Sequence, residues 1–387
     1  MNDISSQAEQ LVEDVANHVT EEFQSLLSMF SPKTNPINWA LIMIPLTVYF
    51  SMSHQSEIAF VTSMGAIAPL AFQMGRATEE ISLRTGESIG GLLNATFGNA
   101  VEMIIAALAI VAASQDPDLI NTMVTVTQAS LIGSILGNLL LVLGLAMFYG
   151  GIKHSKQEFS EMSGQMNGAL LLLAVVALIV PSALHKSGGS DADVLRLSHA
   201  TAVILLVMYA SALVFQLKTH VKDFESSGHT DHETAQLSIR DAWTLLIAST
   251  LLVSWMAHIL VHSLESAIES WSLPTVFVGV VLLPFFGNAA EHFTAVIVAG
   301  KDKMDLSISI AIGSSVQIAL FVAPLMVLLG WALGVPFPLE FGILETAATF
   351  GSVFITIALL ADGRTHWLEG MMALSCYAIL AIAFFYA

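Results

Sequence analysis

Long apolar segments recur along almost the whole chain, and they constrain the fold more than any other feature of the sequence. A helix needs about 20 apolar residues to cross the hydrocarbon core of a bilayer. Eleven such segments can be counted, at 37–53, 57–76, 86–113, 119–149, 165–184, 198–217, 240–262, 274–299, 305–332, 338–361 and 366–386. Lipid offers the backbone no hydrogen-bond partners, and no segment alternates as a barrel strand does. The sequence therefore predicts an all-α integral membrane protein with eleven transmembrane helices.

The composition agrees with a chain embedded in a lipid bilayer. Of 387 residues, 55% are hydrophobic and only 11% are charged, with a mean hydropathy of +0.75. Soluble domains carry about 25% charged residues. The formal net charge is −18, but the acids concentrate in polar segments, so nucleic acid is not an expected partner. The single cysteine, Cys376, lies in an apolar run and predicts a packed thiol. The sequence leaves homo-oligomer formation open.

The basic residues predict the orientation in the membrane. If the N-terminus is cytosolic, only Lys186 and Arg196 of the 13 basic residues fall outside, and the other 11 fall inside. This bias follows the positive-inside rule and predicts a multi-pass protein with a cytosolic N-terminus. Residues 1–36 show neither a signal peptide nor an organellar targeting segment. We therefore expect a prokaryotic plasma membrane, with a vacuolar membrane as the alternative.

Two polar segments divide the chain. Residues 1–36 predict an acidic, amphipathic cytosolic helix that either packs on the membrane domain or serves regulation or assembly. Residues 219–239 predict an acidic cytosolic linker that is either simply solvated or able to sense ions. The remaining parts are the first transmembrane helix at 37–56, the first repeat half at 57–218 and the second repeat half at 240–387.

A short polar motif occurs twice within apolar surroundings. "GNAVE" at 98–102 matches "GNAAE" at 287–291, and each copy is followed by a further matching stretch, "LIGSILGN" at 131–138 and "AIGSSVQI" at 311–318. Two matches in the same order indicate duplication. Each half contains five spans, so the halves enter the membrane from opposite sides. The sequence thus predicts an inverted repeat of five plus five helices with an extra N-terminal helix, an arrangement typical of secondary transporters.

The repeated acids are Glu102 and Glu291. Glu102 lies sixteen residues after the start of its span at 86, near the bilayer centre, and Glu291 is similarly deep. A carboxylate at this depth must be protonated, bound to a cation or exposed to a water-filled cavity, because its charge is costly in lipid. No basic residue lies deep in these spans. The alternative is a pair of structural carboxylates that hydrogen-bond between helices.

Two carboxylates from the two halves would form a site of charge −2 lined by oxygen atoms, which suits a hard divalent cation such as Ca²⁺. Backbone carbonyls at the interrupted helices and nearby amide and hydroxyl groups could complete the shell, although each could instead serve only helix packing. The candidates are Gly98, Asn99, Gly287, Asn288, Ser130, Ser134, Asn138, Ser314, Ser315 and Gln317. Asn99 and Asn288, three residues before each glutamate, could alternatively cap the interrupted helices.

The same carboxylates predict coupling to protons. Burial and mutual repulsion favour their protonated forms when the cation leaves, so protons and metal compete for one site. His292, next to Glu291, could relay protons or tune the site, or it could be a packed interhelical histidine. Glu345 could pass ions at the outer mouth or be a packing carboxylate. No covalently bound cofactor is expected; Ca²⁺ is expected as the transported ion and H⁺ as the counter-ion.

At these residues a resemblance becomes specific. "GGLLNATFGNAVEMIIA" from residue 90 and "GNAAEHFTAVIVA" from residue 287, with "ATEE" at 77–80, resemble the two α-repeats of the Ca²⁺/H⁺ antiporter (CAX) family of the cation/Ca²⁺ exchanger superfamily. The resemblance implies exchange of cytosolic Ca²⁺ for protons by alternating access, with Glu102 and Glu291 as carriers. The serine-proline motifs of sodium/calcium exchangers are absent, which disfavours sodium as the counter-ion.

Other functions remain as alternatives. An antiporter for Mn²⁺, Na⁺ or K⁺, or a passive cation channel, would also need acidic groups in the membrane. An intramembrane enzyme is disfavoured, because "HETAQ" at 232–236 lacks the second histidine of a metalloprotease motif and no GxSxG is present.

Overall fold

The computed structural model describes residues 28–33, 35–85, 90, 92–93, 96–159, 161–220 and 235–387. The helix predicted within 1–36 and the acidic part of the predicted linker lie almost entirely outside the described residues. The first half contains η1 (Pro36–Ile42), α2 (Met43–Met52), α3 (Ser56–Thr85), α5 (Ala100–Gln115), η2 (Pro117–Leu119), α6 (Ile120–Leu136), η3 (Gly137–Val142), α7 (Leu143–Lys153), β1 (Gln157–Glu158), α8 (Glu161–Lys186), α9 (Asp191–Val214) and η4 (Phe215–Thr219). The second half contains α11 (Ile239–Trp271), α12 (Thr275–Phe277), η5 (Val278–Leu282), α13 (Leu283–Gly287), α14 (Ala289–Ala299), α15 (Met304–Gln317), η6 (Ile318–Val322), α16 (Ala323–Leu333), α17 (Ile343–Leu359), β2 (Arg364–Thr365) and α18 (Trp367–Tyr386).

The apolar segments of the described chain are helical. Seven helices are long and apolar enough to cross a membrane, and an eighth span arises if the pair Thr275–Gly287 and Ala289–Ala299, bent by 59°, is one span. Shorter apolar helices are Pro36–Met52, Ala100–Gln115 and Ile343–Leu359. Each of the eleven predicted segments overlaps one of these helices, but their count as eleven membrane spans stays a prediction.

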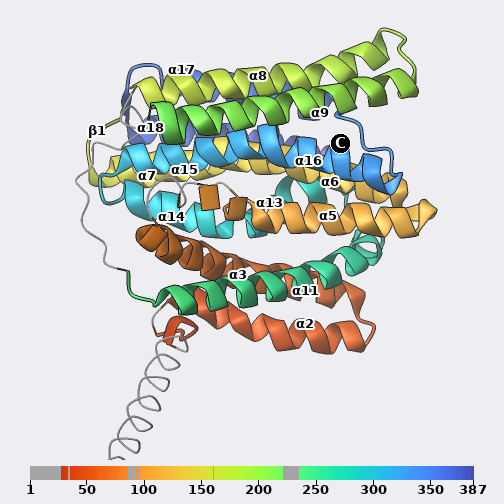
Figure 1. The fold of residues 1–387 in the computed structure, drawn as a ribbon, viewed down its shortest axis with the longest axis horizontal. Helices are drawn as coiled ribbons and strands as arrows, with labels where there is room; N and C mark the ends of the chain where they lie inside the picture. Colours follow the sequence, from red (N-terminus) through yellow and green to blue (C-terminus); the bar gives the residue numbers. More distant parts are fainter. Residues whose placement is uncertain are drawn as a thin grey trace, which may run out of the picture.

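The helices run roughly along one common direction and form layers (Figure 1). α8, α9, α17 and α18 lie on one side, and α2, α3 and α11 lie on the opposite side. The helices that carry the repeated motifs, α5, α6 and α13 to α15, lie between these two layers. The site is therefore placed in the middle of the bundle, away from both outer layers.

Two long helices contain π-helical turns at corresponding places in the two halves. η3 continues α6 into α7, and η6 continues α15 into α16. η6 begins directly after the candidate residue Gln317, and η3 contains the candidate residue Asn138. π-Helical turns inside α-helices are frequent at functional sites.

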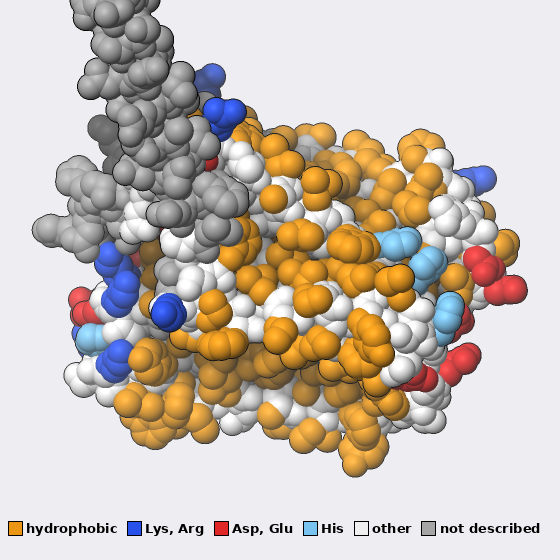
Figure 2. All heavy atoms as spheres, turned by 90° about the horizontal axis from the view of Figure 1, so that it is seen from below, with side chains coloured by type: hydrophobic (Ala, Val, Ile, Leu, Met, Phe, Trp, Pro, Cys, Tyr) orange, Lys and Arg blue, Asp and Glu red, His pale blue; other side chains and the backbone are white. Residues whose placement is uncertain are grey.

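One end of the bundle, which we call the ladder end, carries a two-stranded ladder that the all-α prediction did not include. β1 pairs antiparallel with β2, with Gln157 opposite Thr365. The buried Gln157 amide also donates 2.9 Å hydrogen bonds to the Ala299 carbonyl and to Asp302 Oδ1. Most Lys and Arg side chains on the face in Figure 2 gather toward this end.

The opposite end is crossed by the connection between α16 and α17, residues 334–342. We call this connection the strap, and this end of the bundle the strap end. The hydroxyl of Ser182 accepts from the Phe341 N–H at 3.0 Å, and Ser198 Oγ accepts from the Leu339 N–H at 2.9 Å. Gln128 Nε2 donates to the Pro338 carbonyl at 2.6 Å. These bonds hold 338–342 in a non-helical path, so the predicted span 338–361 begins as a helix only at Ile343.

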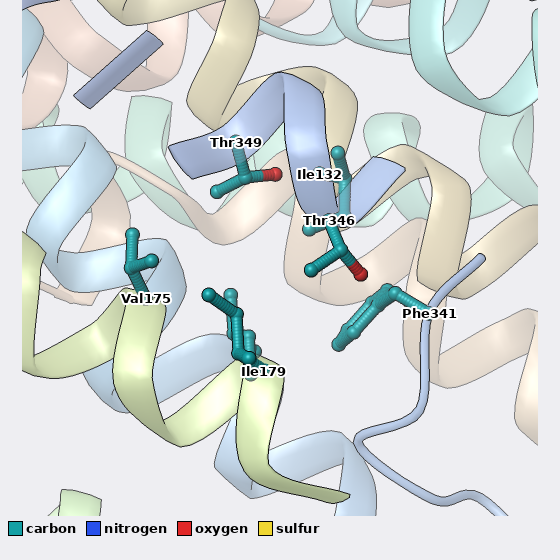
Figure 3. A pocket seen from close by; sticks show the side chains of 7 residues that line it. Ile132, Val175, Ile179, Phe341, Thr346 and Thr349 are labelled. Atoms are coloured by element: carbon teal, nitrogen blue, oxygen red, sulfur yellow. The ribbon is translucent and has the colours of Figure 1, made fainter. Parts of the chain in front are cut away.

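A small pocket lies where the strap meets α6, α8 and α17 (Figure 3). Ile132, Val175 and Ile179 line it together with Phe341 and two threonines of α17. No carboxylate lines this pocket, so it is not suited to bind a bare cation.

Candidate functional site

Each repeated glutamate lies in the first turn of a helix that follows a break. α5 begins two residues before Glu102, and α14 begins two residues before Glu291. Gly98 and Asn99 form a turn that interrupts the predicted span 86–113, so Glu102, although sixteen residues after the start of that span, lies in the first turn of the helix after the break. In the first helical turn the backbone N–H groups have no intrahelical acceptors, so the position favours a negative or hydrogen-bond-accepting group.

The two asparagines of the repeats occupy the N-cap positions but do not act as caps. Neither Asn99 nor Asn288 makes a side-chain hydrogen bond to its own helix. Both are 1% exposed. A buried amide that does not cap its helix needs other partners, because an unpaired buried polar group is costly.

The Glu102 carboxylate of the first half lies against the helix break of the second half. A β-carbon on Gly287 would lie 3.3 Å from Glu102 Oε1, which is closer than an ordinary contact. The carboxylates of Glu102 and Glu291 are close enough to interact electrostatically. Among the described residues, no Lys or Arg forms an ion pair with either of them. The structure thus brings the two acids of the repeats into one region without a fixed countercharge.

The Glu291 carboxylate is held by one group from each half. Ser314 Oγ donates to Oε1 at 2.6 Å, and Asn138 Nδ2 donates to Oε2 at 3.4 Å. Ser314 lies on α15 of the second half, whereas Asn138 lies in η3 of the first half. One carboxylate therefore joins the two halves through hydrogen bonds to both of its oxygens.

A second hydrogen bond crosses between the halves. Asn99 Nδ2 donates to Gln317 Oε1 at 2.5 Å. In the alignment of the repeats, Gln317 corresponds to Gly137, and Asn138 corresponds to Ile318. The two amides that reach across the site thus come from different positions of the duplicated motif.

Several buried polar atoms around the carboxylates have no hydrogen-bond partner. They are Asn99 Oδ1, Glu102 Oε2, Ser134 Oγ, Asn138 Oδ1, and both Nδ2 and Oδ1 of Asn288. Leaving a buried polar group unpaired costs about 1–3 kcal/mol. Five of these six atoms are oxygens, and oxygen ligands are those that Ca²⁺ prefers. The donor set therefore fits a hard cation as a transported substrate.

Small residues let the helices of the two halves approach closely beside the site. A β-carbon on Gly133 of α6 would collide with the Val280 backbone of η5, and a β-carbon on Gly279 would collide with the side chain of Ala129. This crossing places Ser134, the next residue of α6, beside the broken helix of the second half. The repeat alignment marked Gly133, but nothing in the sequence pointed to Gly279 as its neighbour.

The other predicted site residues have different surroundings. Ser130 lines a narrow pocket between α5, α6 and α11, and the Ser315 hydroxyl bonds the Ala311 carbonyl at 3.0 Å within its own helix. The His292 ring makes an edge contact with Phe285 at 6.2 Å between centroids, and its buried Nε2 has no partner. Glu345 is half-buried in the first turn of α17. None of these four residues is seen to bond either carboxylate in the part of the chain that the structure describes.

The sodium/calcium exchanger protein family matches residues 56–218 and 242–386. These two segments contain both helix breaks and most of the chain. The chain belongs to the sodium/calcium exchanger protein family.

Similar proteins share the length and the fold of this exchanger-family chain. A protein of Aphanothece halophytica named Ca(2+)/H(+) antiporter is 41% identical over 363 residues, covering 89% of this chain and 95% of that protein. A rice protein named vacuolar cation/proton exchanger 2 is 41% identical over 367 residues, covering 90% and 81%. The solved structure of native YfkE is 37% identical with a TM-score of 0.77, covering 90% of this chain and 99% of that one. These likenesses confirm the predicted family and the all-α integral membrane fold.

Proposed function

We propose that this exchanger-family protein is a secondary active antiporter that moves Ca²⁺ out of the cytosol in exchange for H⁺ by alternating access. The observation that carries this proposal is the meeting of Glu102 and Glu291 at two helix breaks, surrounded by buried oxygens without partners. The names of its relatives, which are Ca²⁺/H⁺ antiporters and cation/proton exchangers, support the choice of ions.

In this mechanism the two glutamates are the cation and proton carriers. Ca²⁺ binds between their carboxylates, and the side-chain oxygens of Asn99, Asn288 and Ser134 replace part of its hydration shell. Backbone carbonyls at Gly98 and Gly287, with Asn138, Ser314 and Gln317, support the same shell. The flexible, high coordination number of Ca²⁺ suits a set of ligands drawn from four separate helical segments.

Exchange follows from charge balance at the site. When Ca²⁺ leaves, two facing carboxylates cannot both stay charged in a poorly solvated interior, so protons bind in its place. The cation-bound and protonated forms are then able to change their accessible side, whereas the empty, doubly charged form is not. This restriction converts competition for one site into coupled flux.

The remaining candidates have supporting roles in the proposal. His292 adjoins Glu291 and tunes the site or relays a proton through its unpaired Nε2. Ser130 borders the approach along α6, and Glu345 attracts ions at the mouth on its side of the bundle. The N-terminus lies in the cytosol, since the ladder end carries most of the basic residues seen in Figure 2. A prokaryotic plasma membrane is the favoured location, and a vacuolar membrane is the alternative.

The test is ion flux in proteoliposomes with an acidic lumen. Radiolabelled Ca²⁺ is expected to accumulate in the lumen, and Glu102→Gln or Glu291→Gln is expected to abolish the accumulation. Wild-type exchange by either variant would refute the central-site mechanism. Competition by Mn²⁺, Na⁺ and K⁺ tests the alternative cations.

A second arm separates antiport from a passive channel. The pH gradient is dissipated by a protonophore while the voltage is clamped at zero with K⁺ and valinomycin. Uphill Ca²⁺ uptake should then stop. Uphill uptake that persists would exclude proton coupling, and rapid downhill flux without saturation would indicate a channel.

A further inference from the structure

The outward face of α11 carries two histidines where the membrane-facing surface is otherwise largely apolar. His258 and His262 are both exposed, and they are one helical turn apart in the sequence "HILVH". Figure 2 shows histidine side chains gathered toward one end of the apolar face formed by α2, α3 and α11. Polar, ionisable groups at such places are costly, and they usually mark a function.

The histidines point away from the exchange site. The opposite face of α11 carries Leu260, Val261 and Leu264, which are buried and line the pocket shared with α5 and α6. The exposed imidazoles lie on the other side of this helix. They therefore have no part in the cluster around Glu102 and Glu291.

The pair lies in the half of α11 that is nearer the strap end. α11 ends at Trp271. His262 lies nine residues before this end and His258 thirteen, which corresponds to about 14 Å and about 20 Å along the helix at the usual rise. A helix of 33 residues exceeds the hydrocarbon core of about 30 Å by about 20 Å in total. His262 thus lies near the boundary of the core, and His258 lies one turn deeper.

The geometry of the rings suits shared metal binding. Their centroids are 4.7 Å apart and the rings are tilted by 55°. A metal held at about 2.0–2.1 Å from one nitrogen of each ring brings two ring centres to roughly 5 Å apart. Many zinc enzymes hold their metal with two histidines at positions i and i+4 of one helix.

Carboxylates on the same side of α11 favour cations at this place. Glu265 and Glu269 continue the stripe of His258 and His262 toward the end of the helix, at steps of three and four residues. Beyond them Glu57 accepts a 2.7 Å hydrogen bond from Ser270. No group of three or more His, Cys, Asp or Glu side chains that could hold a metal ion occurs among the described residues. The site is therefore built from two imidazoles.

We propose that His258 and His262 form a surface site for a first-row transition-metal cation, such as Zn²⁺ or Cu²⁺, at the strap end of α11. Imidazole nitrogens suit these metals, whereas carboxylates and carbonyls suit Ca²⁺. The two sites of the protein thus differ in ligand chemistry, and Ca²⁺ does not compete for the histidines. The site is independent of the proposed exchange activity.

The experiment measures metal binding to the full chain in nanodiscs of zwitterionic lipid, with millimolar Ca²⁺ present to occupy the oxygen-lined site. Zn²⁺ binding is followed by calorimetry, and Cu²⁺ binding by the nitrogen couplings in its electron paramagnetic resonance spectrum. The wild type should bind one ion with a two-nitrogen signature. Single variants His258→Ala and His262→Ala should retain a one-nitrogen signature at best, and the double variant should lose the ion.

The matched control is the double variant His154→Ala/His199→Ala, which also removes two histidines but from separate elements, since His154 directly follows α7 and His199 lies in α9. It should bind Zn²⁺ and Cu²⁺ as the wild type does. An unchanged elution profile and unchanged Ca²⁺ binding show that the His258/His262 variants are folded. The proposal is overturned if the wild type shows no two-nitrogen signal, or if the double variant His258→Ala/His262→Ala binds Zn²⁺ as tightly as the wild type.

Discussion

The helix crossing beside the site should be sensitive to a single methyl group at Gly133. A β-carbon there would lie 2.6 Å from both the carbonyl carbon and the Cα of Val280. Carbon atoms in comfortable contact are about 3.5–4.0 Å apart, so α6 and η5 would have to separate by roughly 1 Å. Forcing extra volume into a packed core costs about 1–3 kcal/mol. The displaced segment includes Ser134, so we expect Gly133→Ala to lower transport as well as stability.

The repeat provides a matched control for this prediction. Gly313 corresponds to Gly133 in the second half, also lies inside a helix, and has no described neighbour within 4 Å of a β-carbon. Gly→Ala raises helix propensity by about 1 kcal/mol at either position. That gain cancels when the two variants are compared, so the difference between them measures the overpacking alone.

The assay is thermal unfolding of both variants in the same detergent, together with Ca²⁺ uptake in proteoliposomes. Gly133→Ala should be less stable than Gly313→Ala by about 1–3 kcal/mol, with uptake reduced more strongly than in Gly313→Ala. Equal stability and equal uptake of the two variants would show that the close crossing of α6 and η5 is not a constraint, and the reasoning would fail.

Three further predictions concern the site and its surroundings. Ser134→Ala removes a buried hydroxyl that has no protein partner and is proposed to bind Ca²⁺ directly, so it should weaken Ca²⁺ binding more than Ser314→Ala, whose hydroxyl donates its 2.6 Å bond to Glu291; calorimetry of the two variants compares them, and the reverse order would contradict the assigned contacts. Ca²⁺ affinity at equilibrium should fall as the pH is lowered, because protonated carboxylates do not bind the metal; a flat pH profile would argue against competition at one site. Gln157→Leu removes the buried amide that donates to the Ala299 carbonyl and to Asp302 Oδ1 and should lower stability by about 1–3 kcal/mol while the ion selectivity stays unchanged, as unfolding curves and competition assays would show.

The sequence predicted the class of fold and the central acids for physical reasons that act locally. Apolar segment length predicted helices, and the repeated "GNAVE" and "GNAAE" motifs marked Glu102 and Glu291 because a carboxylate in lipid is conspicuous. The structure has turns beside the two repeated glycines, at Gly98 and Asn99 in the first half and at Asn288 in the second. Counting along the span placed Glu102 sixteen residues from its start, whereas the break makes it a first-turn residue.

The sequence named Asn138 and Gln317 as candidates, but it could not predict which residues of the other half they would bond, because these pairings depend on tertiary packing. Asn138 and Gln317 contact Glu291 and Asn99 from helices far away in the chain, and a repeat alignment pairs each of them with a residue that has no amide. The ladder of β1 and β2 was missed because two-residue strands have no periodicity to detect. The start of α17 was placed five residues too early, since hydrogen bonds from Ser182 and Ser198 hold the preceding strap out of the helix.

The unequal placement of the two bridging amides has a consequence for the history of the molecule. A protein assembled from two identical copies of the first half would carry Asn138 twice and would have Gly137 in place of Gln317, whereas two copies of the second half would carry Gln317 twice and Ile318 in place of Asn138. After the gene duplication that produced the repeat, the two halves have therefore diverged, so that each half now supplies a different bridging amide. Neither half could now return to a symmetric homodimer without losing one of the two bonds that join them.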